Sequence, residues 1–274
     1  MVRKVVDTNY LKNPDLVSYL EESLDNLAVL TDYNGIEAYK ESTGLNLYES
    51  MEIVSQYPKQ IIILTSTIIA CGKIPSKKAG LEWLIDNEQT TQFAEFCNDL
   101  KRSQKGELDI SDFLTESRFE AQHQMRRVQE GTERLLVGMN KMRERFELQF
   151  SPNEIKELRV TKIWSQDIID WVWINAKEMT VHSFETHPST YRIPRKDERV
   201  RTFHFRNCLC ALSFLINWII QGSPQGLNQE RLRNDIVDIN FAAFATFFDG
   251  LLTSDKRLKN TYASAMNILQ LGLK

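Results

Sequence analysis

Three short apolar segments near the start of the chain constrain its fold more than any other feature. They read as β-strands at Lys4–Val6, Leu27–Leu30 and Ile61–Leu64. Segments with helical spacing separate them, one with Pro14 in its first turn and one beginning near Ile36. Short apolar runs are typical of parallel strands covered on both faces, and alternation of strand and helix indicates an α/β fold. The sequence therefore predicts a three-layer α/β sandwich around a central, mostly parallel sheet.

The middle of the chain has a different composition and hydrophobic pattern. Long charged stretches with helical spacing, such as Glu116–Glu147, dominate it, and strand signals nearly vanish. The last quarter is α/β again, with a helix at Asp235–Phe248, a strand at Gly250–Leu252 and a helix at Thr261–Leu271. We expect a core formed by residues 1–75 and 200–274, and a large, mainly helical insertion at 76–199.

Composition excludes several classes of protein. Apolar residues make up 42% of the 274 residues and charged residues 26%, as in ordinary globular proteins. The run Leu209–Ile220 is too short to span a bilayer and no signal peptide is visible, so we expect a soluble, cytoplasmic protein with no membrane partner. The four cysteines form no CxxC pair and the four histidines show no metal-site spacing, so neither zinc nor disulfides are expected. Neither a P-loop nor a GxGxxG stretch supports nucleotide chemistry.

Two carboxylates follow apolar strands. Asp7 follows Val5-Val6, and Asp255 follows Leu251-Leu252 after Thr253-Ser254. Ligands of open parallel sheets bind beyond the carboxyl ends of the strands, so either carboxylate could hold a metal. Each could equally cap the helix that follows it. Both interpretations remain open for both residues.

The helix before the last strand carries more acids. Asp238 and Asp249 lie at the two ends of a face that has Ala242 and Ala245 in its middle. Asp235 lies one turn earlier and could replace Asp238. The alternative is a helix packed on a neighbour, with solvated acids at its ends.

Together these patterns resemble the PIN-domain family of nucleases. Asp7-Thr8-Asn9-Tyr10-Leu11 is similar to the family's opening, and Glu37 follows the second strand, where its second acid usually lies. Asp238 through Asp255 is similar to the closing pattern of acid, helix, strand and Thr-x-Asp. The resemblance covers about residues 1–70 and 230–274; the chain is longer than most PIN domains, and its middle is not covered.

The resemblance implies a divalent-metal-dependent endonuclease that cleaves RNA, in the manner of a toxin or defence ribonuclease. The implied catalytic and metal-binding residues are Asp7, Glu37, Asp238 and Asp255, with Asn9, Thr253, Asp249 and Asp235 supporting them. Clustered carboxylates and hard oxygen ligands favour one or two Mg²⁺ or Mn²⁺ ions, which would activate a water for attack on a phosphodiester.

A basic stretch at Tyr191–Arg206 could bind the substrate. Its cations interleave with the rings of Tyr191, Phe203, His204 and Phe205, a pattern that suits single-stranded nucleic acid. The predicted contacts are Arg192, Arg195, Lys196, Arg199 and Arg201. The alternative is a solvated charged loop that leads into a buried strand or helix.

Two further interpretations stay open. The chain could be a catalytically inactive PIN-like module that binds nucleic acid or protein. The helical middle could also dock a protein inhibitor or partner, as toxin-like PIN proteins often do. The sequence leaves a homo-oligomer open as well.

Overall fold

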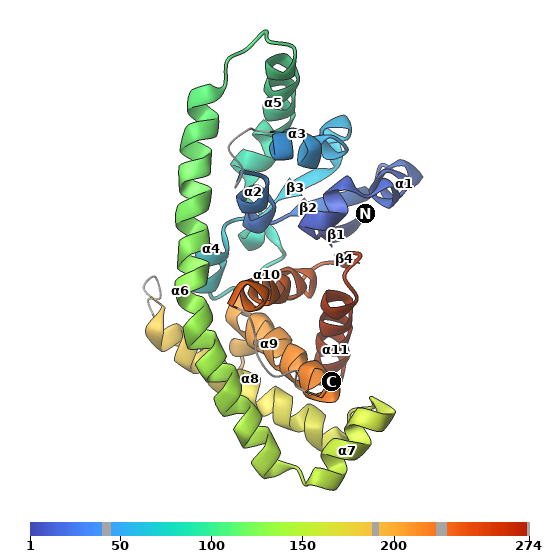
Figure 1. Cartoon of the computed structure of the whole chain (residues 1–274), viewed down its shortest axis with the longest axis vertical. Coiled ribbons are helices and arrows are strands. Elements are labelled where there is room, and N and C mark those ends of the chain that lie inside the picture. The colour runs from blue at the N-terminus through green and yellow to red at the C-terminus, as the bar shows by residue number, and fades with distance from the viewer. Residues whose placement is uncertain (40–44, 188–191, 223–228, 273–274) are drawn as a thin grey trace. The chain divides into compact units, whose positions relative to one another are not determined.

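The computed structural model describes residues 1–39, 45–187, 192–222 and 229–272 (Figure 1). The chain forms two compact units. Unit 1 consists of Met1–Ala70, Lys78–Arg127 and Phe247–Ser254, and unit 2 of Cys71–Lys77, Val128–Thr246 and Asp255–Lys274.

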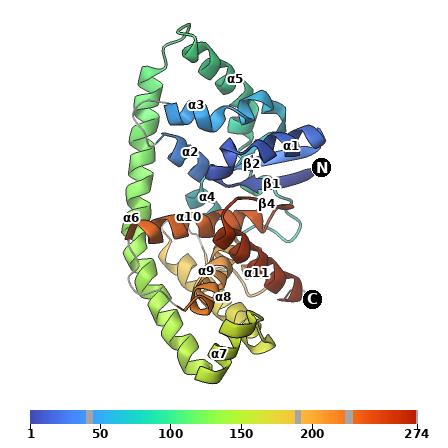
Figure 2. The same ribbon diagram turned by 45° about the vertical axis from the view of Figure 1, so that its right-hand side comes forward.

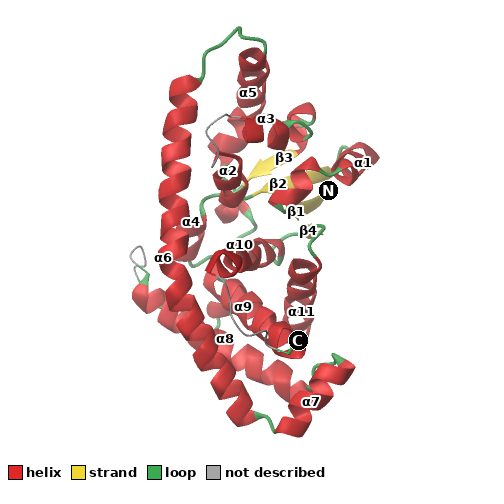
Figure 3. Ribbon diagram, in the orientation of Figure 1, coloured by secondary structure: helices red, strands yellow, loops and turns green. Residues whose placement is uncertain are grey.

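Unit 1 contains a four-stranded sheet in the order β3-β2-β1-β4 (Figure 3). The strands are β1 (Val2–Val6), β2 (Asn26–Leu30), β3 (Ile61–Ile63) and β4 (Gly250–Leu252). All three pairings are parallel. This confirms the α/β class and the parallel sheet, and the four strands match their predicted positions to within two residues.

The strand order reverses at β1. β2 and β3 follow on one side of it, whereas β4, from the far end of the chain, pairs with its other side. Val6 lies opposite Leu252, so the residues that follow both strands meet at the carboxyl edge of the sheet. Strand side chains such as Val5, Ala28 and Val29 are fully buried, which explains why the strands are apolar at these positions.

Helices make up most of the remaining described chain. In chain order the α-helices are α1 (Pro14–Glu22), α2 (Asp32–Tyr39), α3 (Leu45–Met51), α4 (Thr67–Gly72), α5 (Asn87–Gln104), α6 (Ser111–Gln149), α7 (Pro152–Thr161), α8 (Gln166–Thr186), α9 (Phe203–Ile220), α10 (Gln229–Ala245) and α11 (Lys256–Gly272). Short 3₁₀ helices are η1 (Thr8–Lys12), η2 (Val54–Gln56), η3 (Pro58–Gln60), η4 (Glu82–Leu84) and η5 (Arg199–Arg201). The described part of 76–199 is helical, apart from a β-bridge between Leu64 and Ile85, as expected.

Unit 2 is built around α9, which packs against α8, α10 and α11 (Figure 2). Among the described residues, α9 is the one helix long and apolar enough to cross a membrane, and 78% of it is buried inside the protein, as in a core helix. The grouping of 200–274 with 1–75 differs from the observed units. Beyond residue 200, only Phe247–Ser254 belongs to the unit that contains the sheet.

Several predicted helix ends were wrong, because caps and turns decide them. α2 begins at Asp32 rather than near Ile36, and the apolar run Leu209–Ile220 lies within α9, which begins at Phe203 after its N-cap Thr202. α10 ends at Ala245 rather than Phe248. α11 begins at Lys256 rather than Thr261, since the Asp255 carboxylate accepts hydrogen bonds from the first backbone N–H groups of the helix.

Candidate functional site at the carboxyl edge of the sheet

Asp7 is a buried carboxylate at the end of β1. Its residue is 4% exposed, and its side chain makes no capping hydrogen bond to η1. The Thr253 hydroxyl donates to Asp7 Oδ2 over 2.8 Å, and the Asp7 backbone N–H donates to the Leu252 carbonyl over 2.9 Å. The capping alternative therefore does not hold for Asp7, and its expected neighbour Thr253 contacts it directly.

Asn34 joins the ends of β1 and β2. Its side chain is buried, its Oδ1 accepts from the Thr31 backbone N–H over 2.7 Å, and its Nδ2 donates to the Val6 carbonyl over 3.1 Å. One amide thus fixes the backbone directly before Asp7 and the turn into α2. The sequence analysis did not identify this role of Asn34.

Asp32 is an acid at this edge that the sequence analysis missed. It follows β2 in the way that Asp7 follows β1, and its carboxylate accepts from the backbone N–H and the hydroxyl of Thr67 over 2.7 and 2.8 Å. Burial raises the pKa of the Asp32 carboxyl above its ordinary value. The same signal that pointed to Asp7, a carboxylate just after an apolar strand, would have found it.

Glu37 and Asn9, two other expected site residues, also belong to unit 1. Glu37 lies on α2, where its backbone carbonyl accepts from Asn46 Nδ2 over 2.8 Å. Asn9 lies in η1 and is exposed. Their contribution to metal binding stays a prediction.

Asp249 lies at the other end of the sheet. Its carboxylate accepts from the Arg3 backbone N–H over 2.8 Å and pairs with the Arg3 guanidinium over 3.6 Å, beside the start of β1. Three residues separate Arg3 from Asp7 along the strand, which places Asp249 roughly 13 Å from the carboxyl edge. The expectation that it supports the ligands at Asp7 was therefore wrong.

The remaining acids belong to unit 2, and two of them have structural partners. Asp255 Oδ1 accepts from the backbone N–H groups of Arg257 and Leu258 over 2.6 and 3.0 Å, so it is the N-cap of α11. Asp235 is 1% exposed and pairs with the Arg257 guanidinium over 3.0 Å. It also lines a cavity of about 20 Å³ with Trp218 and Thr261, enough for one water molecule. Asp238 lies partly buried on α10.

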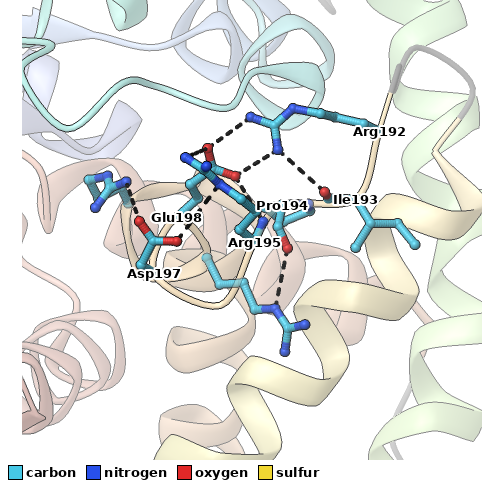
Figure 4. Close-up of polar contacts among 8 residues, drawn as sticks. Arg192, Ile193, Pro194, Arg195, Asp197 and Glu198 are labelled. Atoms are coloured by element: carbon cyan, nitrogen blue, oxygen red, sulfur yellow. Dashed lines mark hydrogen bonds and ion pairs between the residues drawn. The ribbon is translucent and has the colours of Figure 1, made fainter.

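The basic stretch is organised around an acid (Figure 4). Glu198 is buried, and both its oxygens accept hydrogen bonds from Arg192, over 2.6 and 2.9 Å. Arg195 adds bonds from its backbone N–H and its guanidinium. These contacts hold the pKa of the Glu198 carboxyl well below its usual range, the hydrogen bonds from Arg192 having the largest effect.

The other predicted nucleic-acid contacts divide into two groups. Arg199 donates to the Pro194 carbonyl and Arg201 pairs with Asp197, whereas Lys196 is exposed. Phe203 and Phe205 are fully buried, so their expected role in base stacking was wrong; Tyr191 lies outside the described residues. The structure matches the alternative of a charged loop leading into a buried helix.

Three possible metal ligands also meet in unit 2, which sequence spacing did not indicate. The ligand atoms of Cys71, His187 and His204 all lie within 4.8 Å of one another. Burial, helped by the nearby His187, lowers the pKa of His204 to about 4. The three residues are too far apart in sequence for any spacing rule to connect them.

Comparison with protein-family models, with curated proteins and with solved structures finds no match for this chain. Of the four expected acidic ligands, Asp7 and Glu37 belong to unit 1, and Asp238 and Asp255 to unit 2. Within unit 1 the carboxyl edge of the sheet brings together Asp7, Asp32, Asn34 and Thr253, and this is the candidate functional site.

Proposed function

We propose that the chain is a PIN-like, divalent-metal-dependent endonuclease whose site lies at the carboxyl edge of the sheet and whose substrate is single-stranded RNA. In this proposal the sheet is the centre of a three-layer sandwich. The observation that carries it is the place of Asp7. This buried carboxylate directly follows β1, the strand at which the strand order reverses, and Thr253, which directly follows the adjacent β4, donates to it. Ligands of open α/β sheets bind at such a switch point.

The chemistry of the edge supports a hard cation. Asp7 Oδ2 has a fixed orientation, because the Thr253 hydroxyl donates to it and the Asp7 backbone is bonded to β4. Carboxylate oxygens held in this way are the ligands that Mg²⁺ and Mn²⁺ prefer. Such an ion, when bound, lowers the pKa of a water molecule and stabilises charge on the phosphate. In the proposal Glu37 is the second acidic ligand from unit 1, and Asp32 is an additional acid at the same edge; the family resemblance also implies Asp238 and Asp255, which belong to unit 2.

In the proposal the basic loop at residues 192–201 binds phosphates of the substrate. Residues 192–201 contain five basic side chains and two acidic ones, so a positive surplus remains after the pairing with Glu198 and Asp197. Arg192 and Arg195 keep 51% and 74% of their side chains exposed and can still contact phosphates. An inhibitor or partner docked on the helical region is compatible with this activity.

The alternative of an inactive binding module is favoured by one observation. Asp255 uses Oδ1 to cap α11, and Asp235, the substitute for Asp238, is paired with Arg257. Acids engaged in this way have fewer oxygens to offer a metal. In this reading the fold and the basic loop bind RNA without cleaving it.

A cleavage assay separates the two functions. Labelled single-stranded RNA and DNA are incubated with Mn²⁺ and with wild type, Asp7→Asn or Asp99→Asn. Asp99 is an exposed carboxylate on α5 that pairs with Arg102, and it serves as the matched control. We expect wild type and Asp99→Asn to cleave RNA, and Asp7→Asn to be at least about 100-fold slower with an unchanged circular dichroism spectrum, because losing a metal ligand costs more than losing a residue that only orients one.

Full activity of Asp7→Asn with Mn²⁺ supplied would contradict the assignment of the site. If wild type binds the same RNA but cleaves neither RNA nor DNA, the binding module is the correct function. Faster cleavage of DNA than of RNA would overturn the substrate while leaving the chemistry in place.

A further inference from the structure

The Cys71, His187 and His204 cluster is independent of the sheet edge and of the proposed nuclease activity. All three residues belong to unit 2. Cys71 lies in the last turn of α4, His187 is the C-cap of α8, and His204 lies in the first turn of α9. Local capping fixes the two histidine segments. The His187 backbone N–H donates to the Ser183 carbonyl, and the Thr202 hydroxyl caps α9 by accepting from the Phe205 backbone N–H.

The separations of the three ligand atoms suit a single ion. One Sγ and two imidazole nitrogens lie within 4.8 Å of one another. Donor atoms around a tetrahedral Zn²⁺, with Zn–S of about 2.3 Å and Zn–N of about 2.0–2.1 Å, lie about 3.3–3.7 Å apart. The difference is at most roughly 1.5 Å, and in the proposal small rotations of the three side chains within their rotamer wells close it.

His204 adds a second observation that points to a ligand. Its Nε2 is buried and has no hydrogen-bond partner among the described residues. A buried polar atom without a partner is costly and needs an explanation, and an unseen ion is one of the common ones. The ring also packs edge-on against Phe184, with centroids 4.8 Å apart, which gives one side of the site an apolar wall. Such a wall limits solvent access to a bound metal.

The donor set selects the ion. A thiolate with two imidazoles favours Zn²⁺ over the hard cations Mg²⁺ and Mn²⁺, which take oxygen ligands. We propose that Cys71, His187 and His204 bind one Zn²⁺ ion, with the fourth position occupied by water. Binding releases the Cys71 thiol proton to solvent and uses both histidines in the neutral form. The ion would fix the short Cys71–Lys77 segment onto the ends of α8 and α9, within the same unit.

Metal analysis of the intact chain tests this proposal. We expect the purified protein to hold one Zn²⁺ per chain. After removal of the metal, Co²⁺ alone should produce a thiolate-to-Co²⁺ charge-transfer band and the intense visible bands of a tetrahedral site. Chelation should lower the thermal midpoint, because an ion that binds only the folded state stabilises it.

Matched variants identify the ligands. Cys71→Ser and His204→Asn should weaken Zn²⁺ binding by at least about 100-fold, more than the loss of a residue that only orients a ligand. Cys97→Ser, a buried thiol of unit 1, and His182→Asn, an exposed histidine of α8, should bind as wild type does. Asp7→Asn should also keep its Zn²⁺, which separates this site from the proposed nuclease site.

A wild-type chain that takes up no stoichiometric Zn²⁺ would overturn the proposal, and so would a Co²⁺ complex without a charge-transfer band. Unchanged affinity in Cys71→Ser would do the same. If a variant fails to fold, the spectrum of the wild-type Co²⁺ complex tests the proposal without it. His187→Asn then provides the second ligand test, because His187 lies at the end of a helix rather than inside one.

Discussion

The two units hold their buried and half-buried carboxylates in different ways. At the sheet edge of unit 1, threonine hydroxyls donate to Asp7 and to Asp32, and a backbone N–H also donates to Asp32. In unit 2, arginines pair with Asp235 and with Glu198. A hydroxyl or an amide carries only a partial positive charge, whereas a guanidinium carries a full one.

The difference separates acids with a structural task from acids that suit a cation. An arginine neutralises the carboxylate beside it, and the pair then orders the local structure. A threonine orients the carboxylate without neutralising it, so the local field still favours a positive ion. The acids at the sheet edge are therefore better candidates for metal ligands than the arginine-paired acids of unit 2. The ion pairs of Asp235 and Glu198 instead stabilise the fold.

The largest expected effect is on the ion pair of unit 2. Arg257→Met keeps the length of the side chain but leaves Asp235, 1% exposed, without its guanidinium. Removing one partner of a buried ion pair costs about 3–5 kcal/mol. Because Arg257 is partly exposed, we expect Arg257→Met to lower the free energy of unfolding by about 3 kcal/mol. Urea unfolding measures it.

Lys259→Met is the matched control for that substitution. Lys259 is an exposed cation on the same helix, and its replacement should change the unfolding free energy by less than about 0.5 kcal/mol. Equal effects of the two substitutions would show that Asp235 does not depend on Arg257, and the contrast between the units would fail.

A smaller effect is expected at the sheet edge, and it depends on the proposed function. Thr253→Val preserves the shape of the side chain and removes the hydroxyl that donates to Asp7. Residues that orient a metal ligand contribute about 10–100-fold to affinity or activity. We expect Mn²⁺ affinity and RNA cleavage to fall by that factor. Titration calorimetry and the cleavage assay measure the two losses.

Thr91→Val provides the control for Thr253→Val. Thr91 is exposed on α5, and its hydroxyl donates only to the Asn87 carbonyl. It should behave as wild type in both measurements. If Thr253→Val also binds Mn²⁺ with wild-type affinity, Thr253 does not orient a metal ligand. That result would contradict the proposed role of Asp7 in metal binding.

The sequence predicted the strands well and the partners of the acids less well. The apolar runs Val5-Val6, Leu27–Leu30 and Ile61–Ile63 mark β1, β2 and β3 directly, because burial on both faces favours apolar side chains there. Asp7 was found because it follows such a run. Asp32 also lies just after such a run, but the family resemblance places the second acid at Glu37.

Long-range partners could not be read from the chain. Nothing in the sequence shows that Arg257 pairs with Asp235, or that Cys71 meets His187 and His204, because only the packing of helices brings these side chains together. The capping interpretation of Asp255 was available from the sequence, and the structure supports it, whereas for Asp7 it does not. The same local pattern therefore has two outcomes, and tertiary contacts decide between them.

The smallest expected effect, and the sharpest test of the comparison, is a pair of opposite pH dependences. Burial raises the pKa of Asp32 above its ordinary 3.8, so the folded state binds this proton more tightly than the unfolded state does. Its contribution to stability is complete below that value and is lost as pH rises through the raised pKa. The arginines lower the pKa of Glu198 below its ordinary 4.5, so its contribution is present above that value and is lost as pH falls through the lowered pKa.

Chemical unfolding of wild type, Asp32→Asn and Glu198→Gln across pH 3 to 7 measures the slope of the unfolding free energy against pH for each protein. Relative to wild type, Asp32→Asn should gain stability as pH rises, because the variant has no buried charge to form. Glu198→Gln should lose stability relative to wild type as pH rises toward about 5, because only the wild type gains the ion pair with Arg192 and Arg195. Asp197→Asn, whose ion pairs of 3.8 and 3.9 Å lie at an exposed side chain, should show little slope. Slopes of the same sign for Asp32 and Glu198 would contradict the distinction between the two units.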